Sequence, residues 1–384
     1  MKKIALVVTQ SSWGGAQRYV YDLALFFRRQ GHVVLVIAGK DKDPILLKRL
    51  EEQQVETTTM ASLIRSINPF IDIICLIQLF LLFRSRKFDV VHLNSSKAGV
   101  LGSAAAWFAR SPCIVYTAHG FVFNEQLSPI VKRFYIFVER FSSFFRDLII
   151  TVSEFDHHTA LQYGIVPRQK LRTIWNGIDV THDTYVERQK ARAYLLGDTD
   201  VNLNDKFVIG CVANFYTNKG LSYLITAMKL VVKKYPHAVL LIVGNGSLRP
   251  NLEKLITHLN ISQYVFLVGY RKDPERYLKA FDAIVSASLK EGLSYTILEA
   301  ARARVPIIAT AVGGTSEIIY DHIHGILVHP ENIELLAEAM IIAIKDPQTL
   351  KTYTIQAHER VTKEFDVEKM VSTTLAAYSE YIKK

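Results

Sequence analysis

Short apolar runs and longer amphipathic segments alternate along the first half of the chain. The short runs are rich in β-branched residues and predict strands, and each is followed by a segment with apolar residues at helical spacing. This alternation predicts a parallel sheet that is covered by helices on both faces. The predicted strands are Ile4–Val8, Val33–Ile37, Val90–Leu93, Cys113–Thr117 and Leu148–Val152, and the predicted helices are Ala16–Gln30, Phe70–Phe83, Ala98–Arg110, Pro129–Phe145 and Glu154–Tyr163.

The second half of the chain repeats this alternation, so we expect two doubly wound α/β domains. The boundary is predicted after Trp175–Asp179, because the turn dipeptide Asn176-Gly177 precedes a polar, charge-rich stretch that extends to Asp205. The final segment, 367–384, is predicted to be helical. The strands predicted in this half are Val208–Val212, Ala238–Val243, Val265–Val268, Ala283–Ser286 and Ile307–Ala309.

The run Phe70–Phe83 is the most apolar of the predicted helices. It has 14 residues, including Asp72, whereas a membrane-spanning helix needs about 20 apolar residues. Two interpretations remain open. The run is either a buried core helix, or a helix that lies in a membrane interface with Arg84 and Lys87 beside it.

Composition narrows the class of protein. The 384 residues are 49% hydrophobic and 21% charged, which is typical of a folded chain with two or three domains. Cys75, Cys113 and Cys211 lie far apart in apolar runs without metal-ligand spacing, so we expect buried thiols in a reducing compartment and no metal site. The apolar start is short enough to be a first strand rather than a signal peptide, which predicts a cytoplasmic protein.

Positive charge is concentrated in the first half of the chain. Residues 1–178 carry 22 Lys and Arg against 13 Asp and Glu, whereas residues 179–384 carry 24 against 23. This asymmetry predicts that the first half faces an anionic partner, either a phosphate-bearing substrate or an anionic membrane surface. No motif with interleaved aromatic residues is present, so we do not expect a nucleic-acid partner.

Two glycine-rich loops follow predicted strands. Gly14-Gly15 leads into the first helix, and paired glycines allow a backbone to approach a phosphate at a helix N-terminus. Gly244-Asn-Gly246 resembles part of a dinucleotide-binding fingerprint. That fingerprint needs Gly or Ala three residues later, where Arg249 stands, so an NAD site is not predicted.

The segment from Ser288 to Ala300 is the most informative. Glu291 lies in the loop after a predicted strand, and Glu299 lies one turn into the following helix. Two carboxylates at one strand end can accept hydrogen bonds from the hydroxyls of a single ligand. The backbone amides of Gly292, Leu293 and Ser294 suit a sugar or phosphate oxygen. On spacing alone, a loop carboxylate plus a solvated helix glutamate remains an equal alternative.

The ordered set of motifs resembles glycosyltransferase family 4, which has the GT-B fold of two Rossmann-like domains facing a cleft. The resemblance covers nearly the whole chain. It rests on Gly14-Gly15, Ala118-His119-Gly120, Trp175–Asp179, Asn214–Gly220, Val243–Gly246, Gly269–Arg271, Glu291–Glu299 and Pro306–Glu317.

The resemblance implies a retaining transferase that uses a nucleoside diphosphate sugar without a metal ion or cofactor. In that family the first glutamate contacts donor-sugar hydroxyls and the second contacts the ribose, roles that fall on Glu291 and Glu299. Lys219 matches a diphosphate-binding lysine, but Asn214 stands where the family has arginine. An amide donates a hydrogen bond but does not neutralise charge, so an arginine from elsewhere would have to compensate, or Lys219 and backbone amides would carry the diphosphate.

The resemblance also assigns residues to the sugar and the base. His119 would touch the donor sugar or the acceptor, while a turn histidine bonded to backbone is the alternative. Tyr270 and Arg271 would lie near the base and hold it largely through backbone groups. The other histidines, including His157 and His158, are expected on helix or turn surfaces.

By the same resemblance, residues 1–176 would bind the acceptor, residues 177–366 would bind the donor, and the helix at about 367–384 would cross back to the first domain. We expect transfer of a hexose or N-acetylhexosamine, from UDP-sugar, to a glycan or polyprenyl-diphosphate-linked acceptor in cell-surface polysaccharide synthesis. The protein would be cytoplasmic or peripheral on the inner membrane face. A nucleotide-sugar 2-epimerase and a non-catalytic binding protein are the alternatives.

Overall fold

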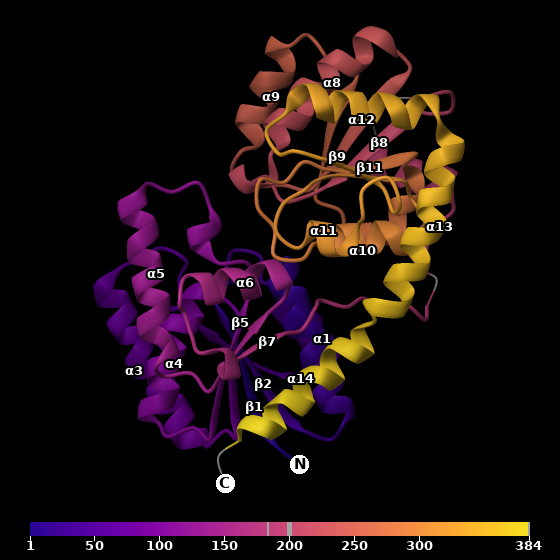
Figure 1. Ribbon diagram of the computed structural model, residues 1–384. Coiled ribbons are helices and arrows are strands. Elements are labelled where there is room, and N and C mark those ends of the chain that lie inside the picture. Colours follow the sequence, from indigo (N-terminus) through magenta and orange to yellow (C-terminus); the bar gives the residue numbers. More distant parts are fainter. Residues whose placement is uncertain (183, 198–201, 383–384) are drawn as a thin grey trace. The chain divides into compact units, whose positions relative to one another are not determined.

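The computed structural model describes residues 1–182, 184–197 and 202–382, and the chain divides into two compact units. Met1–Gly177 with Val367–Lys384 form the first unit, and Ile178–Asp366 form the second. The division between Gly177 and Ile178 falls within the predicted turn segment Trp175–Asp179, one residue after the expected limit of the first domain at residue 176. In each unit, helices pack on a parallel sheet (Figure 1), which is the predicted fold class.

The first unit contains a seven-stranded sheet in the order β3-β2-β1-β4-β5-β6-β7, with all described pairs parallel. Its elements are β1 (Lys3–Val8), α1 (Gly15–Arg29), β2 (Val33–Gly39), α2 (Ile45–Glu52), β3 (Glu56–Met60), α3 (Pro69–Arg86), β4 (Val90–Leu93), α4 (Ser96–Phe108), β5 (Cys113–Ala118), η1 (Val122–Asn124), α5 (Pro129–Ser143), β6 (Leu148–Thr151), α6 (Glu154–Gln162), η2 (Arg168–Lys170), β7 (Leu171–Thr173) and α14 (Val367–Tyr381).

The second unit contains a six-stranded parallel sheet in the order β10-β9-β8-β11-β12-β13. Its elements are α7 (Arg188–Leu196), β8 (Phe207–Val212), η3 (Thr217–Lys219), α8 (Leu221–Lys234), β9 (Ala238–Val243), α9 (Arg249–His258), β10 (Val265–Gly269), η4 (Pro274–Ala280), β11 (Ala283–Ser286), α10 (Tyr295–Arg302), β12 (Ile307–Thr310), α11 (Thr315–Ile318), β13 (Ile326–Val328), α12 (Ile333–Lys345) and α13 (Pro347–Glu364).

The alternation of side chains along β1 explains why apolar runs became central strands. Ile4, Leu6 and Val8 pack into one core with α1 and α14, whereas Ala5 and Val7 pack into a second core with α3 and α4. Successive side chains of a strand point to opposite faces, so a strand covered on both faces must be apolar at every position. All ten predicted strands are present, and nine of them lie inside their sheets; the tenth, β10, is an edge strand whose sequence is apolar.

The strands that the sequence pattern missed are β3, β7 and β13, and each lies at an edge of its sheet. β3 reads Glu-Thr-Thr-Thr-Met, and β7 and β13 have three residues each. Edge strands are less covered than central ones, and they are often short or polar. Their sequences therefore lack the apolar signal that marks the central strands.

The helix predicted near Phe70–Phe83 corresponds to α3, and the interpretation as a buried core helix is wrong. Of its residues only Cys75, Leu79 and Phe83 are buried. Phe70 is 82% exposed, and the side chains one and two turns further along the same face are also exposed. In the described part of the chain, no helix combines the length and apolar character needed to cross a membrane.

The terminal helix α14 packs on the first unit and inserts Tyr378 into its core. The Tyr378 hydroxyl hydrogen-bonds Nδ1 of His92 at 2.5 Å, and Nε2 of His92 hydrogen-bonds Oγ1 of Thr117 at 2.6 Å. His92 lies in the central strand β4 and is fully buried, so the expectation that the histidines other than His119 lie on surfaces is wrong for this residue. The two hydrogen bonds satisfy both ring nitrogens, which allows a polar ring inside the core.

Replacing Tyr378 by phenylalanine is expected to lower the free energy of unfolding of the first unit by about 1–3 kcal/mol, because Nδ1 of His92 would be left buried without a partner. Trp13, Trp107 and Trp175 all lie in this unit, so tryptophan emission during urea unfolding measures its stability selectively. The exposed Ser379→Ala on the same helix is the matched control and should change stability by less than about 0.5 kcal/mol. Equal stabilities of Tyr378→Phe and wild type would contradict the prediction.

Candidate active site

The strand order of the second unit reverses between β8 and β11. Open parallel sheets bind ligands outside the carboxyl ends of their strands at such a reversal. Lys219 follows β8 and Glu291 follows β11, so both predicted residues lie at this position. Nζ of Lys219 is 2.5 Å from Oε1 of Glu291, and the two side chains are 24% and 13% exposed. The fold thus joins two predicted catalytic residues from distant parts of the sequence.

The loop that carries Glu291 is held from two sides. Oγ of Ser288 donates a hydrogen bond to Oε1 of Glu291 at 2.7 Å, which orients the carboxylate. Gly313, with φ of +51°, packs so closely that a Cβ there would lie 1.8 Å from the backbone oxygen of Glu291. The amide of Gly314 donates to the oxygen of Gly292 at 2.9 Å. The loop after β12 therefore supports the loop after β11.

Ser288 and Gly313 were not among the predicted site residues. The paired glycines Gly313-Gly314 after a predicted strand were the available signal, since such pairs mark close backbone approach. No comparable signal identified Ser288, because a serine in a loop is common.

The loop that carries Lys219 is equally constrained. Gly220 has φ of +61° and caps α8, and a Cβ there would lie 1.9 Å from the backbone oxygen of Ala287. The amide of Leu289 donates to the oxygen of Asn218 at 2.8 Å. These contacts bring the loop after β8 against the end of β11, which positions Lys219 beside Glu291.

A small cavity of about 20 Å³ lies beside this ion pair. A cavity of this size with polar walls accommodates about one water molecule. Burial raises the pKa of Cys211 to about 12, so this thiol in the wall is neutral and is not a nucleophile at pH 7. Polar side chains in the wall are those of Lys219, Ser286, Ser288, Glu291, Ser294 and Thr296.

Glu299 lies in the second turn of α10 and is 9% exposed. The alternative of a solvated helix glutamate is therefore wrong. Leu293 and Ser294, at the start of the same helix, are also buried. The first turn of α10 contains no acidic side chain, so its positive end is not neutralised from within the helix.

Further predicted nucleotide-binding residues lie in the loops after β8, β9 and β10. Asn214 is half-buried after β8, and Gly244 after β9 has φ of +139°, with a Cβ position 1.9 Å from the oxygen of Ala213. Gly244 thus permits the close packing of these two loops. Tyr270 is 45% exposed, and Nη2 of Arg271 donates to the oxygen of Leu195 in α7 at 2.9 Å. The Arg271 side chain therefore supports α7.

In the first unit, Gly14 is the N-cap of α1 and Gly15 begins the helix. The preceding loop is tied down because the amides of Ser11 and Ser12 both donate to Oδ2 of Asp41, at 2.6 and 2.8 Å. The first turn of α1 contains no acidic residue. This helix end therefore presents backbone N–H groups and a positive dipole at the carboxyl edge of the first sheet.

His119 lies in the loop after β5, and its ring meets the Tyr19 ring edge-on at a centroid distance of 4.9 Å. Burial lowers the pKa of His119 to about 3, so the imidazole is neutral at pH 7. Among the residues that the structure describes, its shielded Nε2 has no hydrogen-bond partner. A neutral imidazole with an available nitrogen suits a hydroxyl ligand better than a phosphate.

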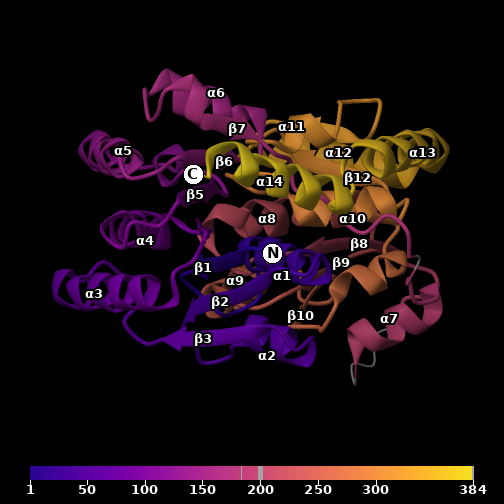
Figure 2. The same cartoon turned by 90° about the horizontal axis from the view of Figure 1, so that it is seen from below.

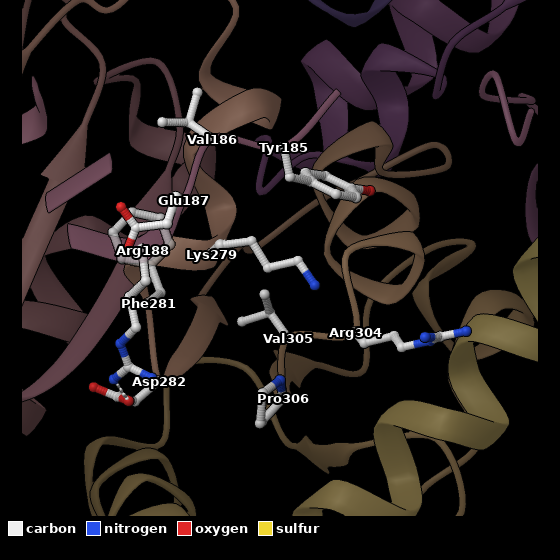
Figure 3. Close-up of a pocket in the computed structure, with 10 residues that line it drawn as sticks. All are labelled: Tyr185, Val186, Glu187, Arg188, Lys279, Phe281, Asp282, Arg304, Val305 and Pro306. Atoms are coloured by element: carbon white, nitrogen blue, oxygen red, sulfur yellow. Dashed lines mark hydrogen bonds and ion pairs between the residues drawn. The ribbon is translucent and has the colours of Figure 1, made fainter. Parts of the chain in front are cut away.

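A separate hollow of about 640 Å³ lies at the amino ends of strands of the second sheet, opposite the carboxyl ends that carry the candidate site (Figure 3). Asp282 and Pro306 in its wall immediately precede β11 and β12, so they lie at the amino ends of these strands. Arg188 and Asp282 form an ion pair within it. None of the predicted donor residues lines this hollow, and we assign the candidate site to the carboxyl edge instead.

The described residues contain no cluster of three or more His, Cys, Asp or Glu side chains arranged to hold a metal ion.

Two family models match the chain, one in each half. The model described as Glycosyltransferase Family 4 matches residues 13–182, and the model described as Glycosyl transferases group 1 matches residues 199–360.

Curated relatives span nearly the full length of the chain. UDP-Gal:alpha-D-GlcNAc-diphosphoundecaprenol alpha-1,3-galactosyltransferase from Escherichia coli is 28% identical over 99% of this chain and 97% of the relative. The capsular polysaccharide biosynthesis glycosyltransferase CapM from Staphylococcus aureus is 24% identical over 94% of this chain and 93% of the relative.

Solved structures share the fold. Anabaena Alr3699/HepE, in complex with UDP and glucose, matches with a TM-score of 0.85 at 22% identity, over 99% of this chain and all of that chain. TarM from S. aureus matches with a TM-score of 0.77 at 14% identity, over 98% of this chain and all of that chain.

Proposed function

This chain belongs to the glycosyltransferases with the GT-B fold, with a family 4 domain followed by a group 1 domain, and we propose that it transfers a sugar from a UDP-sugar. The sugar is a hexose or an N-acetylhexosamine, and the acceptor is a glycan or a polyprenyl-diphosphate-linked sugar of a cell-surface polysaccharide. The ion pair of Lys219 and Glu291 at the reversal of the second sheet is the observation that carries this proposal.

The ion pair suits the reaction because it combines a cation and a carboxylate at one strand edge. In the proposed reaction the bond from the anomeric carbon to the diphosphate breaks, and the acceptor oxygen bonds to that carbon on the same face. The acceptor proton passes to the leaving diphosphate. Lys219 meets the negative charge that grows on the leaving group, as preorganised cations do in other enzymes.

The hydroxyl groups of the donor are bound by two carboxylates in this proposal. We assign the donor-sugar hydroxyls to Glu291, which Ser288 orients, and the ribose hydroxyls to Glu299 in α10. The amides of Gly292, Leu293 and Ser294 at the start of this helix are assigned to donor oxygens. Gly244, Tyr270 and Arg271 are assigned to the base, through backbone groups.

The remaining predicted residues are assigned to the diphosphate and to hydroxyl groups of the substrates. Asn214 donates a hydrogen bond to the diphosphate without neutralising it, so Lys219 supplies the charge. In the first unit, Gly14 and Gly15 are assigned to a phosphate of the ligand. Neutral His119 is assigned to a sugar or acceptor hydroxyl.

A lipid-linked acceptor is supported by one property of the chain and by the name of one relative. Residues 1–178 carry the excess of positive charge, and the named substrate of the E. coli relative is a diphosphoundecaprenol-linked sugar. We propose that the protein works at the inner face of the cell membrane as a peripheral protein, without a cofactor of its own. UDP release that requires an acceptor would support transfer, whereas conversion of the donor alone to an epimer would contradict it.

Replacing Glu299 by alanine is expected to weaken UDP binding by about 10–100-fold, because a charged hydrogen-bond partner contributes about 1.5–3 kcal/mol. Titration calorimetry with UDP measures this directly, and Glu299→Gln provides a second variant of nearly the same shape. Glu338→Ala, an exposed carboxylate in α12, is the control and should bind UDP as wild type does. Unchanged UDP affinity in both Glu299 variants would exclude the assigned ribose contact.

A further inference from the structure

The outer faces of α3, α4 and α5 expose a set of large apolar side chains bordered by positive charge. We propose that this surface, called the apolar face below, inserts into the headgroup–acyl boundary of an anionic lipid bilayer. The inference deepens the proposed lipid-linked acceptor by naming the surface that meets the membrane. It depends only on the first unit, so it can fail while sugar transfer stands.

α5 contributes a continuous stripe to the apolar face. Ile130, Phe134, Phe137, Phe141 and Phe144 recur at alternating spacings of four and three residues, which places them on one side of the helix. They are 80%, 54%, 64%, 61% and 71% exposed. Single exposed apolar residues are common, but a stripe of four phenylalanines along one helix is not expected on a surface that meets only water.

α3 extends the apolar face. Phe70, Ile73, Ile74, Ile77 and Leu81 are all exposed and follow the same helical spacing. The opposite side of α3 packs on the sheet, so the helix uses one apolar side for the core and presents a second apolar side outward. α3, α4 and α5 lie side by side in Figures 1 and 2.

Aromatic contacts at the end of α4 join this helix to α5. Trp107 is 44% exposed and Phe108 is 56% exposed. The Trp107 ring lies 6.3 Å from the Phe144 ring and 5.5 Å from the Phe145 ring, between centroids. Tryptophan and phenylalanine are the side chains that amphipathic membrane-surface helices place at the headgroup level.

The carboxylates of α3 and α5 are neutralised by ion pairs with neighbouring cations. The single carboxylate of α3, Asp72, is 2.5 Å from Nζ of Lys97, and the single carboxylate of α5, Glu139, is 2.7 Å from the buried guanidinium of Arg146. α4 contains no acidic residue. Exposed cations on or beside the three helices include Arg84, Lys87, Arg110, Arg133 and Arg140, whereas Arg86 is ion-paired with Glu56 at 2.9 Å.

The charge pattern selects a lipid surface over a second copy of the chain. Two copies that paired through the apolar face would bring their cations together, and like charges at an interface oppose association. An anionic bilayer instead offers negative headgroups to the cations and an apolar layer to the aromatic rings. Insertion moves the exposed part of each aromatic side chain out of water, which is favourable because aromatic rings carry large apolar surfaces.

Flotation of the full chain with lipid vesicles tests the proposal. Vesicles of phosphatidylcholine with about 30% phosphatidylglycerol should bind the protein about tenfold more than phosphatidylcholine alone at low salt, and the difference should shrink at high salt. The double variant Phe137→Ser with Phe141→Ser should reduce binding at least about tenfold. Arg84→Gln with Arg133→Gln should lower only the salt-sensitive part.

Matched controls come from the second unit. Leu230→Ser with Ile342→Ser changes two apolar residues that are 39% and 42% exposed, and Lys254→Gln removes an exposed cation; both should bind vesicles as wild type does. Absence of flotation at low salt, or wild-type flotation of the phenylalanine variant, would overturn the proposal. A dimer in analytical ultracentrifugation that Phe137→Ser dissolves would assign the face to a second copy instead. UDP affinity of the phenylalanine variant should stay unchanged, which separates this test from the proposed transfer reaction.

Discussion

Replacing Lys219 by alanine is expected to lower kcat by about 10²–10³-fold, which is the typical cost of removing one preorganised group that stabilises transition-state charge. Nζ of Lys219 lies 2.5 Å from the Glu291 carboxylate, and the loop is fixed by Gly220 against Ala287. The cation is therefore positioned before the reaction begins. Because the charge on the leaving diphosphate grows in the transition state, kcat should fall more than UDP affinity does.

Steady-state kinetics with UDP release, together with UDP calorimetry, separate the two effects. Lys229→Ala removes an exposed cation on α8, the helix that follows the same loop, and should leave both quantities unchanged. Glu291→Gln tests the partner, because the amide keeps the size of the side chain but loses its charge. A kcat of Lys219→Ala within about threefold of wild type would remove Lys219 from the proposed mechanism.

The first unit is expected to lose stability as the pH falls from about 6.5 towards 3, because His92 resists protonation. Burial, and secondarily the neighbouring His119, lowers the pKa of His92 to about 3, whereas an unfolded histidine has a pKa of about 6.5. Between these values the unfolded state binds a proton that the folded state does not bind. Acid therefore favours unfolding, and the loss approaches about 4 kcal/mol at the acid end of this range.

Urea unfolding followed by tryptophan emission, at several pH values from 7 to 4, measures the effect in the first unit. His92→Asn should reduce the pH dependence of the unfolding free energy without abolishing it, because His119 in the same unit also has a pKa lowered to about 3. The variant is also expected to be less stable than wild type at pH 7. His258→Asn changes an exposed histidine of the second unit and should leave the profile unchanged. A pH profile of His92→Asn that runs parallel to wild type would refute the assignment to His92.

The central architecture was predictable because it depends on local pattern. Strands such as β1 and β9 are buried on both faces, so each shows a continuous apolar run that no amphipathic helix shows. Three of the four edge strands, β3, β7 and β13, were not predictable, because β3 is polar and β7 and β13 have only three residues each. The fourth, β10, was predicted because its sequence is apolar. α3 shows the same limit. Its apolar run was compatible with burial or with a membrane interface, and only the packing of the unit showed that one side of the helix is exposed.

For the candidate site, too, some features were predictable from the sequence and others were not. Residue type and motif order predicted Lys219, Glu291, Glu299 and His119, because charge and hydrogen-bonding capacity belong to the side chains themselves. The tertiary structure decided that Lys219 and Glu291 touch, since a contact between residues 72 positions apart depends on the strand order. It also brought in Ser288 and Gly313, whose importance lies in what they pack against.

The sequence by itself determined that this chain forms two parallel α/β units and carries the motifs of a glycosyltransferase. Both depend on local hydrophobic pattern and on chemistry that each residue keeps in any conformation. The tertiary structure decided which carboxylates are buried, which histidines resist protonation, and which apolar helix sides face outward. Burial is a property of neighbours distant in sequence, so these properties appear only when the chain has folded.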